Sequence, residues 1–153
     1  PETIHLTLKF LGEAPSSQIK QVFHTLSAFP PIGPFTIHLK GFGVFPHVQH
    51  PRVLWVRIKP CPPLEDLSAK LNVSLEATGF PLPQRVFKPH LTLARFRVPQ
   101  LRPEIKNYFL ADSLTALDPI TVQGFSLFES ILKPEGPTYH KLAQFPANST
   151  KKR

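Results

Sequence analysis

The stretch His5-Leu6-Thr7-Leu8 occurs a second time as His90-Leu91-Thr92-Leu93, and this repetition organises the rest of the sequence. In a β-strand, alternate side chains project to opposite faces of the sheet. Each copy would therefore present its histidine and threonine on one face and its leucines on the other. The alternation predicts two half-buried strands, each with one imidazole and one hydroxyl on a common surface.

Apolar periodicity and turn residues predict the elements around these copies. Leucines recur at helical spacing from residue 64 up to Gly79, which would form the C-cap. The glycines of GFGVFP, residues 41–46, indicate a turn or loop, and the strands at 35–40 and 52–58 on either side look like a hairpin with a long loop. The other predicted elements are a strand from residue 4, a helix over 16–29 capped by Ser16 or Ser17, strands at 35–40, 52–58, 85–96 and 139–145, a strand pair or one bent strand at 120–132, and a helix at 99–110.

This order predicts an α+β fold in one bilobal domain spanning residues 1–153, with residues 147–153 as a flexible tail. Both copies of the repeat are followed by a helix and then by further strands. We therefore expect two pseudo-symmetric lobes, each an antiparallel sheet with helices packed outside. The lobes would face each other across a central cleft, with one copy in each.

Composition narrows the class of protein. The formal charge of +8 favours a polyanionic partner, of which RNA or DNA is the obvious candidate, although many basic proteins bind neither. No apolar run is long enough to cross a bilayer. Cys61 is the only cysteine, which excludes an intrachain disulfide and fits the cytoplasm. We expect a cytoplasmic monomer that makes no contact with membranes.

A pair of histidines facing one substrate can act as acid and base in a single step, because imidazole titrates near neutrality. On either side of a phosphorus atom, one would remove a proton from the attacking oxygen and the other would protonate the leaving oxygen. Threonine hydroxyls can donate to the non-bridging phosphate oxygens. This scheme needs no metal and no cofactor, and it predicts a phosphodiester as substrate.

The two motifs, in the contexts HLTLKFLG and KPHLTLARF, resemble those of the 2H phosphoesterase superfamily. Through GFGVFP, PRVLWVRI and LFESILKPEGPTYHKLAQF, the sequence is similar to the RNA 2',3'-cyclic phosphodiesterases, also called 2'-5' RNA ligases. The resemblance implies a hydrolase in RNA processing that opens 2',3'-cyclic ends to 2'-phosphates. RNA ends, including those of tRNA fragments, or small cyclic nucleotides would be the substrates, and the reverse reaction would be an ATP-independent ligation.

The resemblance also implies roles for individual residues. His5 would be the proton donor and His90 the proton acceptor, while Thr7, Thr92 and Arg95 would bind the phosphate. Simple alternation places Arg95 on the leucine face, so it reaches the phosphate only if the strand twists, bulges or ends. The strand and helix that precede the first motif in the family are absent from this sequence. We expect their absence to leave an unpaired sheet edge beside the first motif.

A few further residues are candidates for contacts or for the core. Lys9 shares the histidine face by alternation and is a possible substrate contact, although a solvated lysine is an equal alternative. Phe45 could stack on a base, while core packing is the alternative for Phe42 or Phe45. Trp55, within an apolar strand, is expected in the core. His47 and His50 have a spacing that could seat zinc, but no further ligands accompany them, so a solvated loop is favoured.

Two other functions would use the same cleft. A non-catalytic module could bind RNA ends or cyclic phosphates without turning them over, although binding alone would not require two proton-transfer groups. A metal-dependent hydrolase would lose its activity on chelation. The sequence favours the metal-independent enzyme over both.

Overall fold

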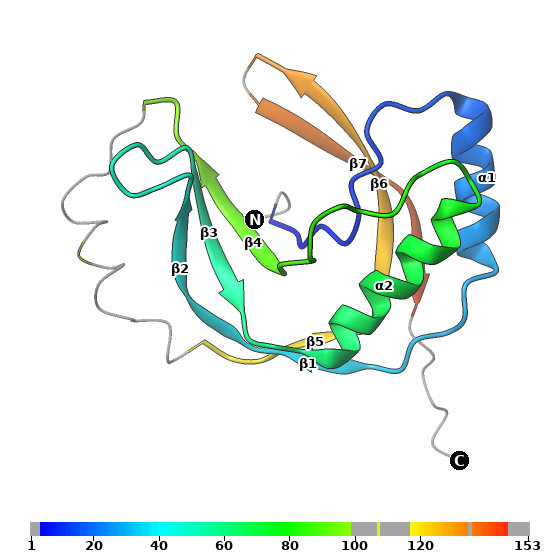
Figure 1. Ribbon diagram of the computed structural model, residues 1–153, viewed down its shortest axis with the longest axis horizontal. Helices are drawn as coiled ribbons and strands as arrows, with labels where there is room; N and C mark the ends of the chain where they lie inside the picture. The colour runs from blue at the N-terminus through cyan, green and yellow to red at the C-terminus, as the bar shows by residue number, and fades with distance from the viewer. Residues whose placement is uncertain (1–3, 99–106, 108–116, 135, 147–153) are drawn as a thin grey trace. The chain divides into compact units, whose positions relative to one another are not determined.

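The computed structural model describes residues 4–98, 107, 117–134 and 136–146, which form helices and antiparallel strands (Figure 1). This agrees with the predicted mixture of helices and antiparallel sheets. Apart from residue 107, the helix expected at 99–110 lies outside the described residues, as does the expected tail. The elements are α1 (Ser16–Ser27), β1 (Phe35–Ile37), β2 (Leu39–Phe45), β3 (Val53–Ile58), α2 (Pro62–Glu76), β4 (His90–Arg95), β5 (Ile120–Val122), β6 (Gly124–Lys133) and β7 (Gly136–Pro146).

The chain forms two compact units, and each is assembled from segments that are distant in sequence. The first unit contains residues 1–7, 37–61 and 88–120, and the second contains residues 8–36, 62–87 and 121–153. β4 comes from the second half of the sequence and pairs with β3 from the first half. The units therefore do not follow the two halves of the chain, and the histidine and threonine of both motifs belong to the first unit. Two lobes with one motif in each remain a prediction.

The second unit holds the largest apolar cluster of the described residues. Val22 and Leu26 of α1 pack with three residues of the leucine stripe of α2, Leu67, Leu71 and Leu75, and with Leu127 of β6. The stripe consists of Leu64, Leu67, Leu71 and Leu75, and each of these residues is buried, as the helical spacing predicts. Gly79 follows the helix with a φ of +91°, a conformation that glycine adopts without steric cost. The β6–β7 hairpin of this unit is antiparallel throughout (Figure 1).

The first unit contains a three-stranded antiparallel sheet in the order β2-β3-β4 (Figure 1). β2 and β3 form the predicted hairpin. The prediction of a turn or loop over residues 41–46 was wrong, because β2 continues through the glycines to Phe45. The strand accommodates them through a β-bulge: the register shifts between Lys40 and Phe42, so Gly41 is an extra residue. Gly41 has a φ of +60°, which suits glycine at a bulge.

Several boundaries differ from the predictions. The first motif is not a full strand, because among the described residues it forms an isolated bridge from Leu6 to Leu91 with no ladder beyond it. Pro15 occupies the N-cap of α1 with no side-chain cap, so the prediction of a serine cap was wrong. The stretch 120–132, expected as a strand pair or one bent strand, is a pair: it divides at Gln123 into β5 and β6, which belong to different sheets. For the first motif, tertiary pairing rather than local alternation sets the extent of the element.

Candidate active site

One face of the β2-β3-β4 sheet collects the side chains of the second motif. In an antiparallel pair, residues directly opposite each other project from the same face. His90 lies opposite Arg57, and Thr92 lies opposite Trp55. Val56, between the two β3 residues, is buried on the other face, while Arg57 is exposed. The histidine and threonine of β4 therefore share an accessible face with Trp55 and Arg57.

The first motif adds its residues to the same face. Leu6 pairs with Leu91 in an antiparallel bridge, so the central residues of the two His-Leu-Thr motifs lie side by side. If the backbone is extended on both sides of the bridge, strand parity places His5 next to Thr92 and Thr7 next to His90. A two-fold axis through the leucine pair relates the two motifs locally. The bridge brings the central leucines of the two motifs together, and a site formed by the four flanking residues stays a prediction.

The two histidines are diagonal neighbours in this arrangement. Diagonal positions in an antiparallel pair are separated by about 7–8 Å. A tetrahedral phosphate between the two rings could therefore meet one imidazole on each side. Thr7 and Thr92 flank the same space from the opposite corners of the rectangle. His5, half-buried, and His90, exposed, both remain accessible to a ligand.

A β-bulge moves Arg95 onto the histidine face. The register of β4 against β3 shifts between Thr92 and Ala94, so Leu93 is an extra residue. Arg95 consequently lies opposite Val53, which has the same parity in β3 as Trp55. Simple alternation predicted the leucine face and was wrong for this reason. The exposed Arg95 joins His90 and Thr92 on one surface, as the motif resemblance requires.

His90 is held in a defined tautomer. Its Nδ1 lies 2.7 Å from the carbonyl oxygen of Lys88. A carbonyl can only accept a hydrogen bond, so Nδ1 must carry the proton and donate it. In the neutral ring, the lone pair is then on Nε2. The face of the β2-β3-β4 sheet that carries His90 and Thr92 is called the site face below. A base on this face requires such a free lone pair, and the contact with Lys88 fixes which nitrogen provides it.

Trp55 lies on the site face rather than in the core, where its apolar neighbours in sequence predicted it. Its ring is half-buried, with its centroid 6.0 Å from that of the His90 ring in an edge-to-face arrangement. A Cβ on Gly43, directly opposite in β2, would overlap the six-membered ring of Trp55. Because β3 has apolar residues on both faces, the sequence does not show which face Trp55 occupies. The polar Arg57, two residues later, is the sequence signal that marks the exposed parity.

Lys9, a possible substrate contact, is engaged within the second unit. Its Nζ donates to Asn72 Oδ1 at 2.7 Å and to the carbonyl oxygen of Pro81 at 2.8 Å. Partial burial lowers the pKa of Lys9, and the nearby carboxylate of Glu76 opposes this shift. These bonds attach the segment after the first motif to α2. A role for Lys9 at the substrate stays a prediction.

The two phenylalanines of the glycine-rich strand separate to opposite faces. Phe45 lies opposite Val53, on the same face as Arg95, and is 63% exposed. Phe42 lies opposite the buried Val56 and is only partly exposed. Phe45 is thus accessible to a base beside the site. Its contact with substrate stays a prediction.

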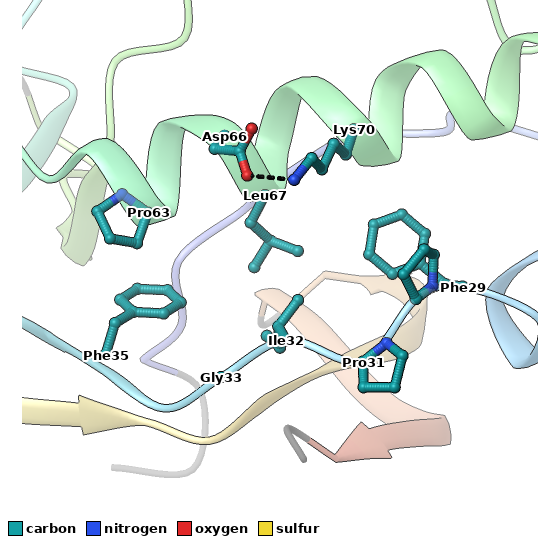
Figure 2. A pocket seen from close by; sticks show the side chains of 10 residues that line it. Phe29, Pro31, Ile32, Gly33, Phe35, Pro63, Asp66, Leu67 and Lys70 are labelled. Carbon is teal, nitrogen blue, oxygen red and sulfur yellow. Dashed lines mark ion pairs between the residues drawn. The ribbon is translucent and has the colours of Figure 1, made fainter.

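Within the part of the chain that the structure describes, two further candidate sites, the His47–His50 pair and a pocket beside α2, have no group of side chains that indicates catalysis or metal binding. His47 and His50 contact each other edge to face, but no group of three or more metal-binding side chains occurs among the described residues. A pocket of about 200 Å³ lies in the second unit against the start of α2, and Figure 2 shows its proline and phenylalanine lining with the Asp66–Lys70 ion pair. None of the motif residues lines it. No helix within the described ranges is long and apolar enough to span a membrane.

Several known proteins are similar to this chain in sequence. The family pattern of the 2'-5' RNA ligase superfamily matches residues 2–131. The chain is 34% identical to the RNA 2',3'-cyclic phosphodiesterase of Archaeoglobus fulgidus over 95% of this chain and 80% of the relative. It is 36% identical to the protein of the same name from Thermus thermophilus over 95% of this chain and 72% of that relative.

Solved structures of other proteins are similar to this chain in fold. A crystal structure of a Thermus thermophilus protein is similar with a TM-score of 0.70 and 31% identity, covering 94% of this chain and 77% of that protein. E. coli LigT in complex with 3'-AMP has the same fold at 23% identity, with a TM-score of 0.70 and coverage of 95% and 78%. The family match spans both histidine motifs and the sheet that carries the second. The chain therefore belongs to the 2'-5' RNA ligase superfamily.

Proposed function

We propose that this protein is an RNA 2',3'-cyclic phosphodiesterase that opens the cyclic end to a 2'-phosphate. The observation that carries the proposal is the antiparallel bridge between Leu6 and Leu91, which places the central residues of the two His-Leu-Thr motifs side by side and so supports a single site. The name of the relatives, RNA 2',3'-cyclic phosphodiesterase, supports the reaction. An RNA end or a small cyclic nucleotide would be the substrate, with tRNA fragments as one source.

The histidines divide the proton transfers of an in-line displacement. His90 Nε2 takes a proton from water, and the water oxygen attacks the phosphorus from the His90 side. The bond from phosphorus to the 3'-oxygen breaks on the opposite side, where His5 donates a proton to the departing oxygen. The product carries a 2'-phosphate and a free 3'-hydroxyl. The Lys88 carbonyl supports this assignment, because it leaves Nε2 of His90 free to act as the base.

The threonines and Arg95 stabilise the charge on the phosphate. Thr7 and Thr92, diagonal to each other by parity, donate to the two non-bridging oxygens. The Arg95 guanidinium, on the same face, offsets the negative charge that grows as the attack proceeds. Such preorganised donors act with the acid and base, whose own contribution is typically about 10²–10⁴ in rate. No step requires a metal ion.

The local two-fold symmetry of the motifs also suits the reverse reaction. If a 5'-hydroxyl replaces water at His90, His90 takes the proton of that hydroxyl, its oxygen attacks the phosphorus, and His5 protonates the departing 3'-oxygen, which leaves a 2'-5' linkage and a free 3'-hydroxyl. A cyclic phosphate and a 5'-hydroxyl would then join without ATP. We further propose a monomeric, cytoplasmic protein with two pseudo-symmetric lobes, which the repeated order of motif, helix and strands supports.

The reaction is tested by incubating the protein with a 2',3'-cyclic nucleotide in EDTA and identifying the product by phosphorus NMR. The proposal predicts turnover to the 2'-phosphate. A 3'-phosphate product would overturn the assignment of the leaving oxygen. Tight binding of the cyclic nucleotide with no product over hours would instead support the binding module.

A further inference from the structure

A second β-bulge places another cation on the site face. Gly41 is the extra residue of β2, and because of it Lys40 lies directly opposite Arg57. Arg57 in turn lies opposite His90 in β4. By parity, Lys40, Arg57, His90 and Thr7 therefore form one row across the sheet. The bulge at Gly41 moves Lys40 onto the site face, just as the bulge at Leu93 moves Arg95 onto it.

The spacing of Lys40, Arg57 and His90 across the sheet would let one RNA strand contact all three residues. Neighbouring strands are separated by about 5 Å, so the backbone of Arg57 is about 5 Å, and that of Lys40 about 10 Å, from that of His90. Both basic side chains are exposed. The guanidinium carbon of Arg57 lies 5.5 Å from the centroid of the Trp55 ring, a cation–π distance. Trp55 also contacts His90, so it holds the guanidinium beside the proposed base.

The charge around this row is positive. Neither Arg57 nor Lys40 forms an ion pair with any residue that the structure describes. In the described part of the first unit, the acidic residue is Asp118, and the basic residues are Lys40, Arg52, Arg57, Lys59, Lys88, Arg95 and Arg97. The row can therefore accept a phosphate without displacing an internal carboxylate.

We propose that Arg57 and Lys40 bind the first phosphodiester on the 5' side of the cyclic end, so that the enzyme prefers an oligoribonucleotide to a mononucleotide. The inference rests on the proposed function, because it needs the cyclic phosphate between the histidines. From that position the RNA can continue only in the 5' direction. Its next phosphate then lies one nucleotide away, within reach of the two side chains. Arginine is suited to this contact because it donates two hydrogen bonds to one phosphate.

The test compares a substrate that has no upstream phosphodiester with one that has it. One is cytidine 2',3'-cyclic phosphate, and the other is a trinucleotide that ends in the same group. For Arg57→Gln and Lys40→Gln, kcat/KM on the trinucleotide should fall by about tenfold, the equivalent of about 1.4 kcal/mol. The mononucleotide, which has no upstream phosphate to lose, should be affected much less than the trinucleotide. Each variant should also lower the salt dependence of trinucleotide binding by about one phosphate contact.

Arg52→Gln is the matched control. Arg52 is an exposed cation of the same unit, but its parity places it on the opposite face from Arg57. It should leave both substrates unaffected. Equal losses on both substrates, or no loss on the trinucleotide in either variant, would overturn the proposal. If the wild type turns over neither substrate, the proposed function fails, and fluorescence anisotropy with the labelled trinucleotide still tests the row: both variants should weaken binding.

Discussion

At the scale of single residues, the two histidines carry different duties although they come from identical motifs. His90 has its Nδ1 bound to the Lys88 carbonyl, whereas the proposed acid, His5, must hold a proton when the leaving oxygen departs. A leaving group that needs no proton makes the acid unnecessary but still requires the base. This difference separates the two roles experimentally.

The sharpest probe is a cyclic substrate in which sulfur replaces the bridging 3'-oxygen. Thiolate leaves without protonation, so His5→Ala should lose about 10²–10⁴ in kcat on the oxygen substrate and much less on the sulfur substrate. His90→Ala should lose activity on both. Rates are compared by following release of the thiol. A His5→Ala variant equally impaired on both substrates would contradict the assignment of the acid.

Lys9 offers a separate test, because its observed contacts are structural. Lys9→Met would leave the buried Asn72 oxygen and the Pro81 carbonyl without their donor, at a cost of about 1–3 kcal/mol in the free energy of unfolding. Urea denaturation measures that loss, and KM should stay unchanged. A raised KM with normal stability would instead identify Lys9 as a substrate contact.

The pKa of Lys9 gives the same comparison a pH dependence. Burial lowers this pKa below the ordinary 10.5, so between the lowered value and 10.5 the unfolded chain binds more protons than the folded chain. The free energy of unfolding contributed by Lys9 therefore rises with pH across that window. The difference in stability between the wild type and Lys9→Met should change there accordingly. A constant difference would show that folding does not shift this pKa.

At the scale of elements, β-bulges decide which cations reach the site. The sequence predicts the histidine and threonine faces correctly, because residues 90–92 pair regularly with β3. It could not predict the face of Arg95 or Lys40, because a bulge inverts the parity of the residues beyond it without a unique local signal. Leu93 resembles any strand residue. Gly41 is a hint of a bulge, but Gly41 and Gly43 together are equally typical of a loop.

The close fit of Gly43 beneath Trp55 makes the strand pair testable. In Gly43→Ala, the new methyl group would overlap the Trp55 ring, which must move and take its contact with His90 along. We expect a loss of both stability and kcat. Trp55→Leu alone removes the ring, so adding Gly43→Ala to it should cost little more. Thermal melts and kcat for the two single variants and the double variant measure the coupling between Gly43 and Trp55. Additive losses in the double variant would contradict the close fit of these two residues.

At the scale of the whole molecule, local periodicity predicts the leucine stripe of α2, the β2–β3 hairpin and the final strand. It could not predict that the first and second motifs pair through their central leucines within one compact unit. That pairing joins one end of the chain to a strand beyond its middle, and no local pattern encodes such a contact. The segments of each compact unit are likewise joined by contacts distant in sequence.

The pairing of the motifs is the central claim, and one measurement tests it most directly. Hydrolysis of a 2',3'-cyclic nucleotide in EDTA is compared among the wild type, His5→Ala, His90→Ala and the double variant, with folding checked by circular dichroism. If the histidines form one site, the wild type turns over, each single variant loses about 10²–10⁴ in kcat, and the double variant loses less than the product of the single losses. A correctly folded single variant that retains the wild-type rate would contradict the account.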